Sequence, residues 1–208
     1  MGLPAEKRRF TVEEYLRMEQ GSESRHEFHD GEVLAMSGGS LEHSIIVTNV
    51  AAALHAALIG SPCLVLDSNL KVGIAKSRRF VYPDVHVNCD GPQFDPRDAT
   101  RQTITNPRLV VEVLSPSTEA CDRGGKFNLY RELASFQEYV LISQEIASVE
   151  TFFRQPDGTW LFTPYSGLTA IAKLRSPSLD LRLSDVYARV EFLKVADAAI
   201  DPPRTRGE

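Results

Sequence analysis

Two acidic residues stand inside otherwise apolar, strand-like runs of this chain. Asp84 lies within Tyr82–Val87, and Glu112 lies within Leu109–Leu114. Burying a lone carboxylate costs several kcal/mol unless a cation, a donor or a metal ion lies beside it. Two carboxylates that converge from neighbouring strands suit a hard cation such as Mg²⁺, which takes oxygen ligands and keeps several waters. Such an ion activates water and stabilises negative charge on a phosphodiester, so the pair predicts hydrolytic chemistry.

A second group of polar residues follows the Glu112 run. Asp122, Lys126 and Tyr130 are spaced i, i+4 and i+8, which places them on one face of a predicted helix. A lysine near the acid pair can neutralise charge that develops on a phosphate. Equally, Glu112 and Lys126 can form a buried ion pair that merely positions the helix. Residue types alone leave both interpretations open.

The elements that must position these residues follow from periodicity and turn signals. Thr11 and Glu14 predict a capping box at a helix start, and Asp30-Gly31 predicts the turn of a hairpin over 26–36. The remaining pattern predicts a helix over 42–59, strands over 63–72, 80–88 and 109–114, a helix over 122–133, a strand over 139–142, and a hairpin formed by 148–153 and 160–165. This order is an α/β core of helix, three strands, helix and strand, with an N-terminal helix and hairpin and a C-terminal β-hairpin. We expect one domain over 1–195 and a flexible tail over 196–208.

Composition excludes several classes of protein. The chain has 208 residues, 42% hydrophobic and 25% charged, which is typical of a globular domain rather than a disordered chain. We expect no membrane association, because no apolar run approaches the roughly 20 residues of a membrane span. Three widely spaced cysteines, Cys63, Cys89 and Cys121, predict reduced thiols in a cytoplasmic protein.

The charge balance bears on nucleic-acid binding. A net charge of −5 and a pI near 5.6 argue against a protein that coats DNA non-specifically. They do not exclude a nuclease, because a local basic rim can serve a site that holds acidic ligands. Lys76, Arg78 and Arg79, or Arg123 and Lys126, are candidates for that rim, although clusters of this kind are as often solvated surface.

An ordered series of motifs links these residues to a known family. Tyr82–Val85, Leu109–Ser117, Asp122, Lys126, Tyr130 and Glu138-Tyr139, preceded by Arg25–Glu32 and Ser40–His43, resemble the Uma-type family of restriction endonucleases. That family belongs to the nuclease superfamily with the signature Pro-Asp, a spacer, then Asp/Glu-X-Lys. The resemblance runs from about residue 10 to residue 157. It implies a restriction-endonuclease-like core and a DNA nuclease that depends on Mg²⁺ or Mn²⁺.

The resemblance also implies residue roles. Asp84 and Glu112 match the metal-binding acids, helped by the backbone carbonyl of Val113. Leu114 stands where the superfamily signature has its lysine, and Lys126 matches the family's replacement from the following helix.

The same resemblance implies supporting roles for three further residues. Glu27 is an auxiliary acid, and His43 assists as acid, base or DNA contact or simply caps and packs at a helix end. Tyr130 orients Lys126 or Glu112.

The sequence therefore predicts a metal-dependent DNA endonuclease. Two alternatives stay open: a non-catalytic DNA- or protein-binding module with the same fold, and a metal-dependent hydrolase of another phosphate ester. A homodimer is expected if both antiparallel strands of a duplex are cut, because a two-fold axis matches their symmetry.

Overall fold

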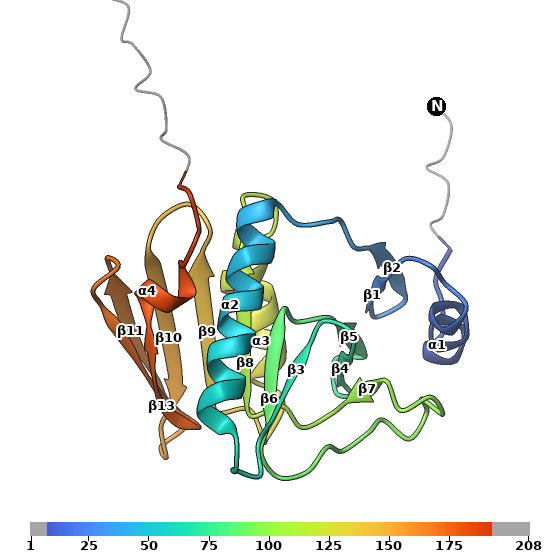
Figure 1. Cartoon of the computed structure of the whole chain (residues 1–208). Helices are drawn as coiled ribbons and strands as arrows, with labels where there is room; N and C mark the ends of the chain where they lie inside the picture. The colour runs from blue at the N-terminus through green and yellow to red at the C-terminus, as the bar shows by residue number, and fades with distance from the viewer. Residues whose placement is uncertain (1–7, 193–208) are drawn as a thin grey trace, which may run out of the picture.

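Two mixed sheets form the framework of the molecule. The computed structural model describes residues 8–192 (Figure 1). Sheet A has the order β2-β1-β5-β4-β7, and sheet B has the order β11-β10-β9-β8-β6-β3. Sheet A comprises β1 (His26–His29), β2 (Glu32–Ala35), β4 (Lys71–Ile74), β5 (Arg79–Val81) and β7 (Thr103–Ile104). Sheet B comprises β3 (Leu64–Asp67), β6 (Val85–Asn88), β8 (Leu109–Leu114), β9 (Glu138–Ser143), β10 (Ser148–Arg154) and β11 (Trp160–Ser166).

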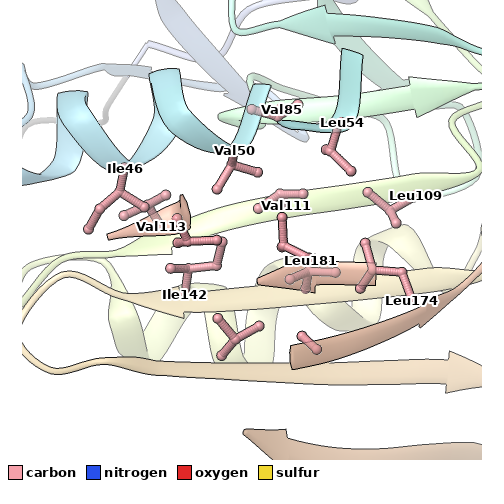
Figure 2. Close-up of a cluster of buried hydrophobic side chains, with 14 of the residues drawn as sticks. Ile46, Val50, Leu54, Val85, Leu109, Val111, Val113, Ile142, Leu174 and Leu181 are labelled. Carbon is pink, nitrogen blue, oxygen red and sulfur yellow. The ribbon is translucent and has the colours of Figure 1, made fainter. Parts of the chain in front are cut away.

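Helices cover both faces of sheet B. Helix α2 (Leu41–Leu58) lies on one face of the sheet, and α3 (Phe127–Tyr130) lies on the other face (Figure 1). The π-helical segment η1 (Cys121–Lys126) leads directly into α3. Figure 2 shows the α2 side, where Ile46, Val50 and Leu54 pack on the valines of β6 and β8. The hairpin β12 (Ile171–Arg175) and β13 (Ser178–Arg182), with α4 (Leu183–Val186), closes this core. Helix α1 (Val12–Gln20) packs on sheet A through Tyr15.

The predicted α/β fold is confirmed, with three corrections to its elements. The run 63–72 forms two strands, β3 and β4, and the run 80–88 also forms two, β5 and β6; each pair is divided between the two sheets. Asp67 accepts hydrogen bonds from the Asn69 backbone and side chain, which turns the chain between β3 and β4. Pro83 cannot donate to a ladder and separates β5 from β6. The hairpin β12–β13 was not predicted, and the proposed tail over 196–208 lies outside the described residues.

Helix α2 also corrects the hydropathy argument. Its 18 residues are long and apolar enough to pass for a membrane span by length and composition alone. Its buried stripe of Ile46, Val50, Leu54 and Leu58 packs in the core against sheet B. The absence of membrane association stays a prediction.

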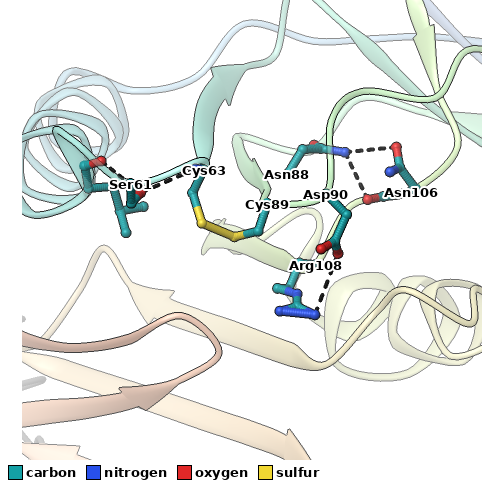
Figure 3. The surroundings of a disulfide bond; sticks show 8 residues. Ser61, Cys63, Asn88, Cys89, Asp90, Asn106 and Arg108 are labelled. Carbon is teal, nitrogen blue, oxygen red and sulfur yellow. Dashed lines mark hydrogen bonds and ion pairs between the residues drawn. A yellow bond between two sulfur atoms is a disulfide. The ribbon is translucent and has the colours of Figure 1, made fainter.

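A disulfide overturns the prediction that the cysteines are reduced. Cys63 and Cys89 are bonded (Figure 3). The antiparallel register pairs Leu64 with Asn88, so the two cysteines form the next cross-strand pair beyond it. Their separation of 26 residues gave no sign of this pairing. Cytosolic proteins rarely carry disulfides, so the cysteine argument for a cytoplasmic location fails and that location stays a prediction. Cys121 is a free, exposed thiol.

Candidate active site

The register of sheet B brings Asp84 and Glu112 together. Val85 pairs with Val111 across the antiparallel strands β6 and β8, so one step further places Asp84 opposite Glu112. Residues directly opposite point to the same face, with Cβ atoms about 4.5–5.5 Å apart. Val85 and Val111 face the α2 core, and the two acids therefore face the α3 side. The backbone N–H of Val113 donates to Asp84 Oδ2 at 2.7 Å and fixes this carboxylate beside β8.

Lys126 lies at the centre of a group of carboxylates. Its Nζ is 3.2 Å from Asp122 Oδ1, 3.3 Å from Glu112 Oε1 and 3.7 Å from Glu27 Oε1. Burial alone lowers the pKa of Lys126, but these carboxylates outweigh it and raise the pKa well above its ordinary value. The side chain therefore stays an ammonium. The π-helical turn that ends at Lys126 is a feature often found at functional sites.

Glu112 is buried and partly neutralised by its neighbours. Tyr130, which is itself fully buried, donates its hydroxyl hydrogen bond to Glu112 Oε1 at 2.8 Å. Desolvation raises the pKa of Glu112 well above its ordinary value, and Lys126 acts in the opposite direction. Glu112 Oε2 and Asp84 Oδ1 accept no hydrogen bond within residues 8–192. One oxygen of each acid is thus free for a ligand.

Glu27 and His43 reach the site from two other elements. Glu27 Oε2 lies 3.0 Å from His29 Nε2, and the Tyr82 N–H donates to Glu27 Oε1 at 3.3 Å. Burial alone would raise the pKa of Glu27, but His29, Lys126 and this N–H keep it below its usual range. His43 lies in the first turn of α2 with Nε2 3.3 Å from Asp84 Oδ2, and this contact raises the pKa of His43 despite partial burial.

The charged residues of the site line one cavity of about 460 Å³. The end of β2 and the segment that joins it to α2, from Leu34 to Ser40, line the same cavity. The charged side chains in the lining are Glu27, His43, Asp84, Glu112, Asp122 and Lys126. Four carboxylates face one ammonium and one imidazole, so the cavity carries an excess of negative charge.

The donor set fits a magnesium-type ion. Asp84 and Glu112 would hold it, because both are hard oxygen ligands with a free atom. No group of three His, Cys, Asp or Glu side chains is preassembled as a metal cage in the described part of the chain. Two protein carboxylates suffice for Mg²⁺, which keeps several of its waters. The Val113 carbonyl stays a predicted ligand; the N–H of that residue is bound to Asp84.

Three further residues near the site, Leu114, His86 and Asp122, differ in their surroundings. Leu114 is buried in the apolar cluster with Tyr130 and Tyr139, so a lysine at that position would meet side chains rather than the cavity. His86, which shares a face of the sheet with Asp84, is fully buried and shares a hydrogen bond with Asn88 at 3.1 Å. Asp122 was omitted from the predicted site, although its spacing to Lys126 was a usable signal.

Comparisons with known proteins bear on the family and the fold of this chain. The model of the Uma2 family, described as "Putative restriction endonuclease", matches residues 12–184. Two proteins of Synechocystis sp., slr1290 and sll1609, both named as uncharacterized, are similar: the first is 38% identical over 88% of this chain and 94% of its own length, and the second is 34% identical over 77% and 89%. A crystal structure titled as a "putative nuclease belonging to DUF820" from Anabaena variabilis superposes with a TM-score of 0.68 at 15% identity. The superposition covers 86% of this chain and 97% of the Anabaena chain. This likeness confirms the restriction-endonuclease-like fold.

Proposed function

The chain belongs to the Uma2 family of restriction-endonuclease type, and from that premise we propose that it is a metal-dependent DNA endonuclease. One observation carries the proposal. Asp84 and Glu112 stand opposite each other with a free oxygen each, and Lys126 projects into the same cavity from the following helix. An acid pair that can hold a metal ion and a nearby ammonium suit phosphodiester hydrolysis, because the ion activates water and the ammonium stabilises negative charge on the phosphate.

Each residue of the site has its own role in the proposed reaction. Asp84 and Glu112 hold the ion, which supplies an activated water and charge stabilisation when bound. Lys126 places its ammonium where negative charge develops on the phosphate. His43, bonded to Asp84, presents an imidazole that can take or give a proton. Tyr130 keeps Glu112 oriented by its hydroxyl bond, and Glu27 keeps Lys126 charged.

The deciding experiment is cleavage of supercoiled plasmid DNA with Mg²⁺ or Mn²⁺. The wild type should nick or linearise the plasmid, and Asp84→Ala should abolish this. Asp90→Ala is the matched control, because Asp90 is exposed and bonded only to Arg108 among the described residues. Equal cleavage by wild type and Asp84→Ala would remove the acid pair from the reaction.

The same preparations test the two alternatives. DNA retardation on a gel without cleavage under either metal would favour the binding module. Turnover of a small phosphate ester without DNA cleavage would favour the other hydrolase.

We further propose DNA as the partner, a two-fold homodimer and a cytoplasmic location; sedimentation of the protein with and without DNA tests the dimer.

A further inference from the structure

Lys126 is shared by three carboxylates, and one of them, Asp122, has no other role in the site. We propose that Asp122 is a positioning residue that holds the Lys126 ammonium in place while Glu112 binds the ion. The inference rests on the proposed function, since it assigns Lys126 a task in that reaction.

The contacts of Asp122 single it out. Its carboxylate is 2% exposed, and Oδ1 accepts no hydrogen bond although it is 3.2 Å from Lys126 Nζ, the shortest of the three ion pairs. Within residues 8–192 Lys126 is its sole ionic partner. The Tyr139 hydroxyl donates to the Asp122 carbonyl at 3.1 Å and anchors the backbone at this point. A buried carboxylate with so few donors is costly, so its pairing with Lys126 is what offsets that cost.

The other two carboxylates have competing partners. Glu112 Oε1 is bonded to Tyr130, and Glu27 is bonded to His29 and to the Tyr82 N–H. Glu112 would be shared between Lys126 and a metal ion held with Asp84, and two cations beside one carboxylate repel each other at short range. Asp122 lies one turn before Lys126 on the same helical segment, so their pairing survives this change. The ammonium therefore stays directed into the cavity instead of turning to solvent.

The rival role for Asp122 is that of a third ligand of the ion. The variant Asp122→Asn distinguishes the positioning role from the ligand role, because it keeps the shape of the side chain and removes its charge. Glu119→Gln is the matched control: it makes the same chemical change on the neighbouring turn, where the Glu119 side chain is 46% exposed and bonded to Arg123.

Measurements of Mn²⁺ affinity and of DNA-cleavage kinetics form the first test. Under the proposal, Asp122→Asn leaves the Kd for Mn²⁺ within about twofold and leaves KM unchanged, while kcat falls roughly 10–100-fold, as for other residues that orient catalytic groups. Glu119→Gln should match the wild type in all three quantities. A Kd for Mn²⁺ that rises tenfold or more would make Asp122 a ligand and overturn the proposal, and so would an unchanged kcat.

The variant Asp122→Glu provides a second test in case Asp122→Asn fails to fold. It keeps the charge but moves the carboxylate by one methylene, so kcat should lie between those of the wild type and Asp122→Asn. A wild-type kcat in this variant would show that Asp122 merely balances charge, which contradicts positioning.

A second test does not depend on cleavage. Lysine amines react with formaldehyde and a mild reductant, and mass spectrometry of peptides gives the rate at each lysine. Lys126 in Asp122→Asn should be methylated faster than Lys126 in the wild type and in Glu119→Gln, with exposed Lys173 as the internal reference. Equal rates at Lys126 overturn the positioning role. A wild type that cleaves no DNA while Lys126 still shows this protection would instead overturn the proposed function.

Discussion

Two buried glutamates on neighbouring parallel strands look alike in the sequence and differ in the structure. Glu112 on β8 is 2% exposed, and Glu138 at the start of β9 is fully buried. Burial raises the pKa of both carboxyls, to about 7 for Glu138 and well above the ordinary value for Glu112. Burial and pKa therefore do not separate them.

Their partners do separate them. Glu138 Oε2 accepts two backbone N–H groups, from Arg175 at 2.8 Å and from Ser176 at 2.7 Å, and so ties β9 to the β12–β13 hairpin. Glu112 meets the ammonium of Lys126 and the hydroxyl of Tyr130, lies opposite Asp84, and opens into the cavity. A buried acid with backbone donors joins elements of the fold, whereas a buried acid among other charges at a cavity is equipped for chemistry.

Replacing each glutamate with glutamine should give the largest contrast. Glu112→Gln removes a ligand charge, and we expect metal-dependent DNA cleavage to fall more than about 10³-fold, since a bound ion supplies several kcal/mol to the transition state. Glu138→Gln should cleave within about twofold of the wild type. Initial rates on one plasmid substrate measure both, and a loss of similar size in the two variants would break the distinction.

Lys126 should give the next largest effect, because it is the cationic partner that Glu112 has and Glu138 lacks among its contacts. Lys126→Ala should lower cleavage roughly 10²–10³-fold while the variant stays folded and binds Mn²⁺. If the lysine is only a structural partner, its loss leaves unpaired buried carboxylates and lowers the free energy of unfolding by about 3–5 kcal/mol. Cleavage rate and melting temperature of the same preparation decide between these outcomes; a fully active variant would remove Lys126 from the site.

Much of the candidate site around Glu112, though not its contrast with Glu138, was present in the sequence as local pattern. The anomaly of Glu112 among aliphatic residues predicted a partner beside it, and the spacing of Asp122, Lys126 and Tyr130 placed candidate partners on one face of the following helix. The strand β8 and the helix α2 were predicted to within two residues, because each is long and strongly periodic. The order of elements was sufficient to predict the fold class.

What sequence reasoning missed depends on contacts between distant segments. The division of 63–72 and 80–88 between two sheets is set by turns at Asp67 and Pro83 and by pairing with strands elsewhere in the chain. The Cys63–Cys89 bond exists because β3 and β6 are neighbours, which no spacing reveals. Glu138 and Glu112 could not be told apart for the same reason, since the partners of Glu138 come from residues 175 and 176.

The pH dependence of folding should carry the signature of Glu138. Its folded pKa is about 7, above the ordinary value of 4.5, so the folded state prefers the protonated acid. The associated stability is present below the ordinary pKa, is lost as the pH rises toward 7, and changes no further above it. At about 1.4 kcal/mol per pKa unit the loss is about 3 kcal/mol.

Urea unfolding at pH 5 and pH 8 measures this loss. Glu138→Gln should show a smaller decrease than the wild type, by about 2.5 kcal/mol between these two pH values, because the other titrating groups are common to both proteins. Parallel decreases in the two proteins would show that Glu138 is not the group responsible.

The smallest expected effect is the stabilisation of the fold by the ion, and it should depend on one glutamate alone. A ligand that binds the folded state at ten times its Kd adds about 1.4 kcal/mol. For a domain of this size that corresponds to a rise in melting temperature of about 3–6 °C. Glu138→Gln should keep the whole rise with Mn²⁺, because its carboxylate lies outside the cavity lining. Glu112→Gln should lose it, since an amide oxygen replaces the charge that faces the ion. Thermal unfolding of the three proteins with Mn²⁺ and with a chelator makes the measurement, and an equal rise in all three would place the ion elsewhere on the molecule.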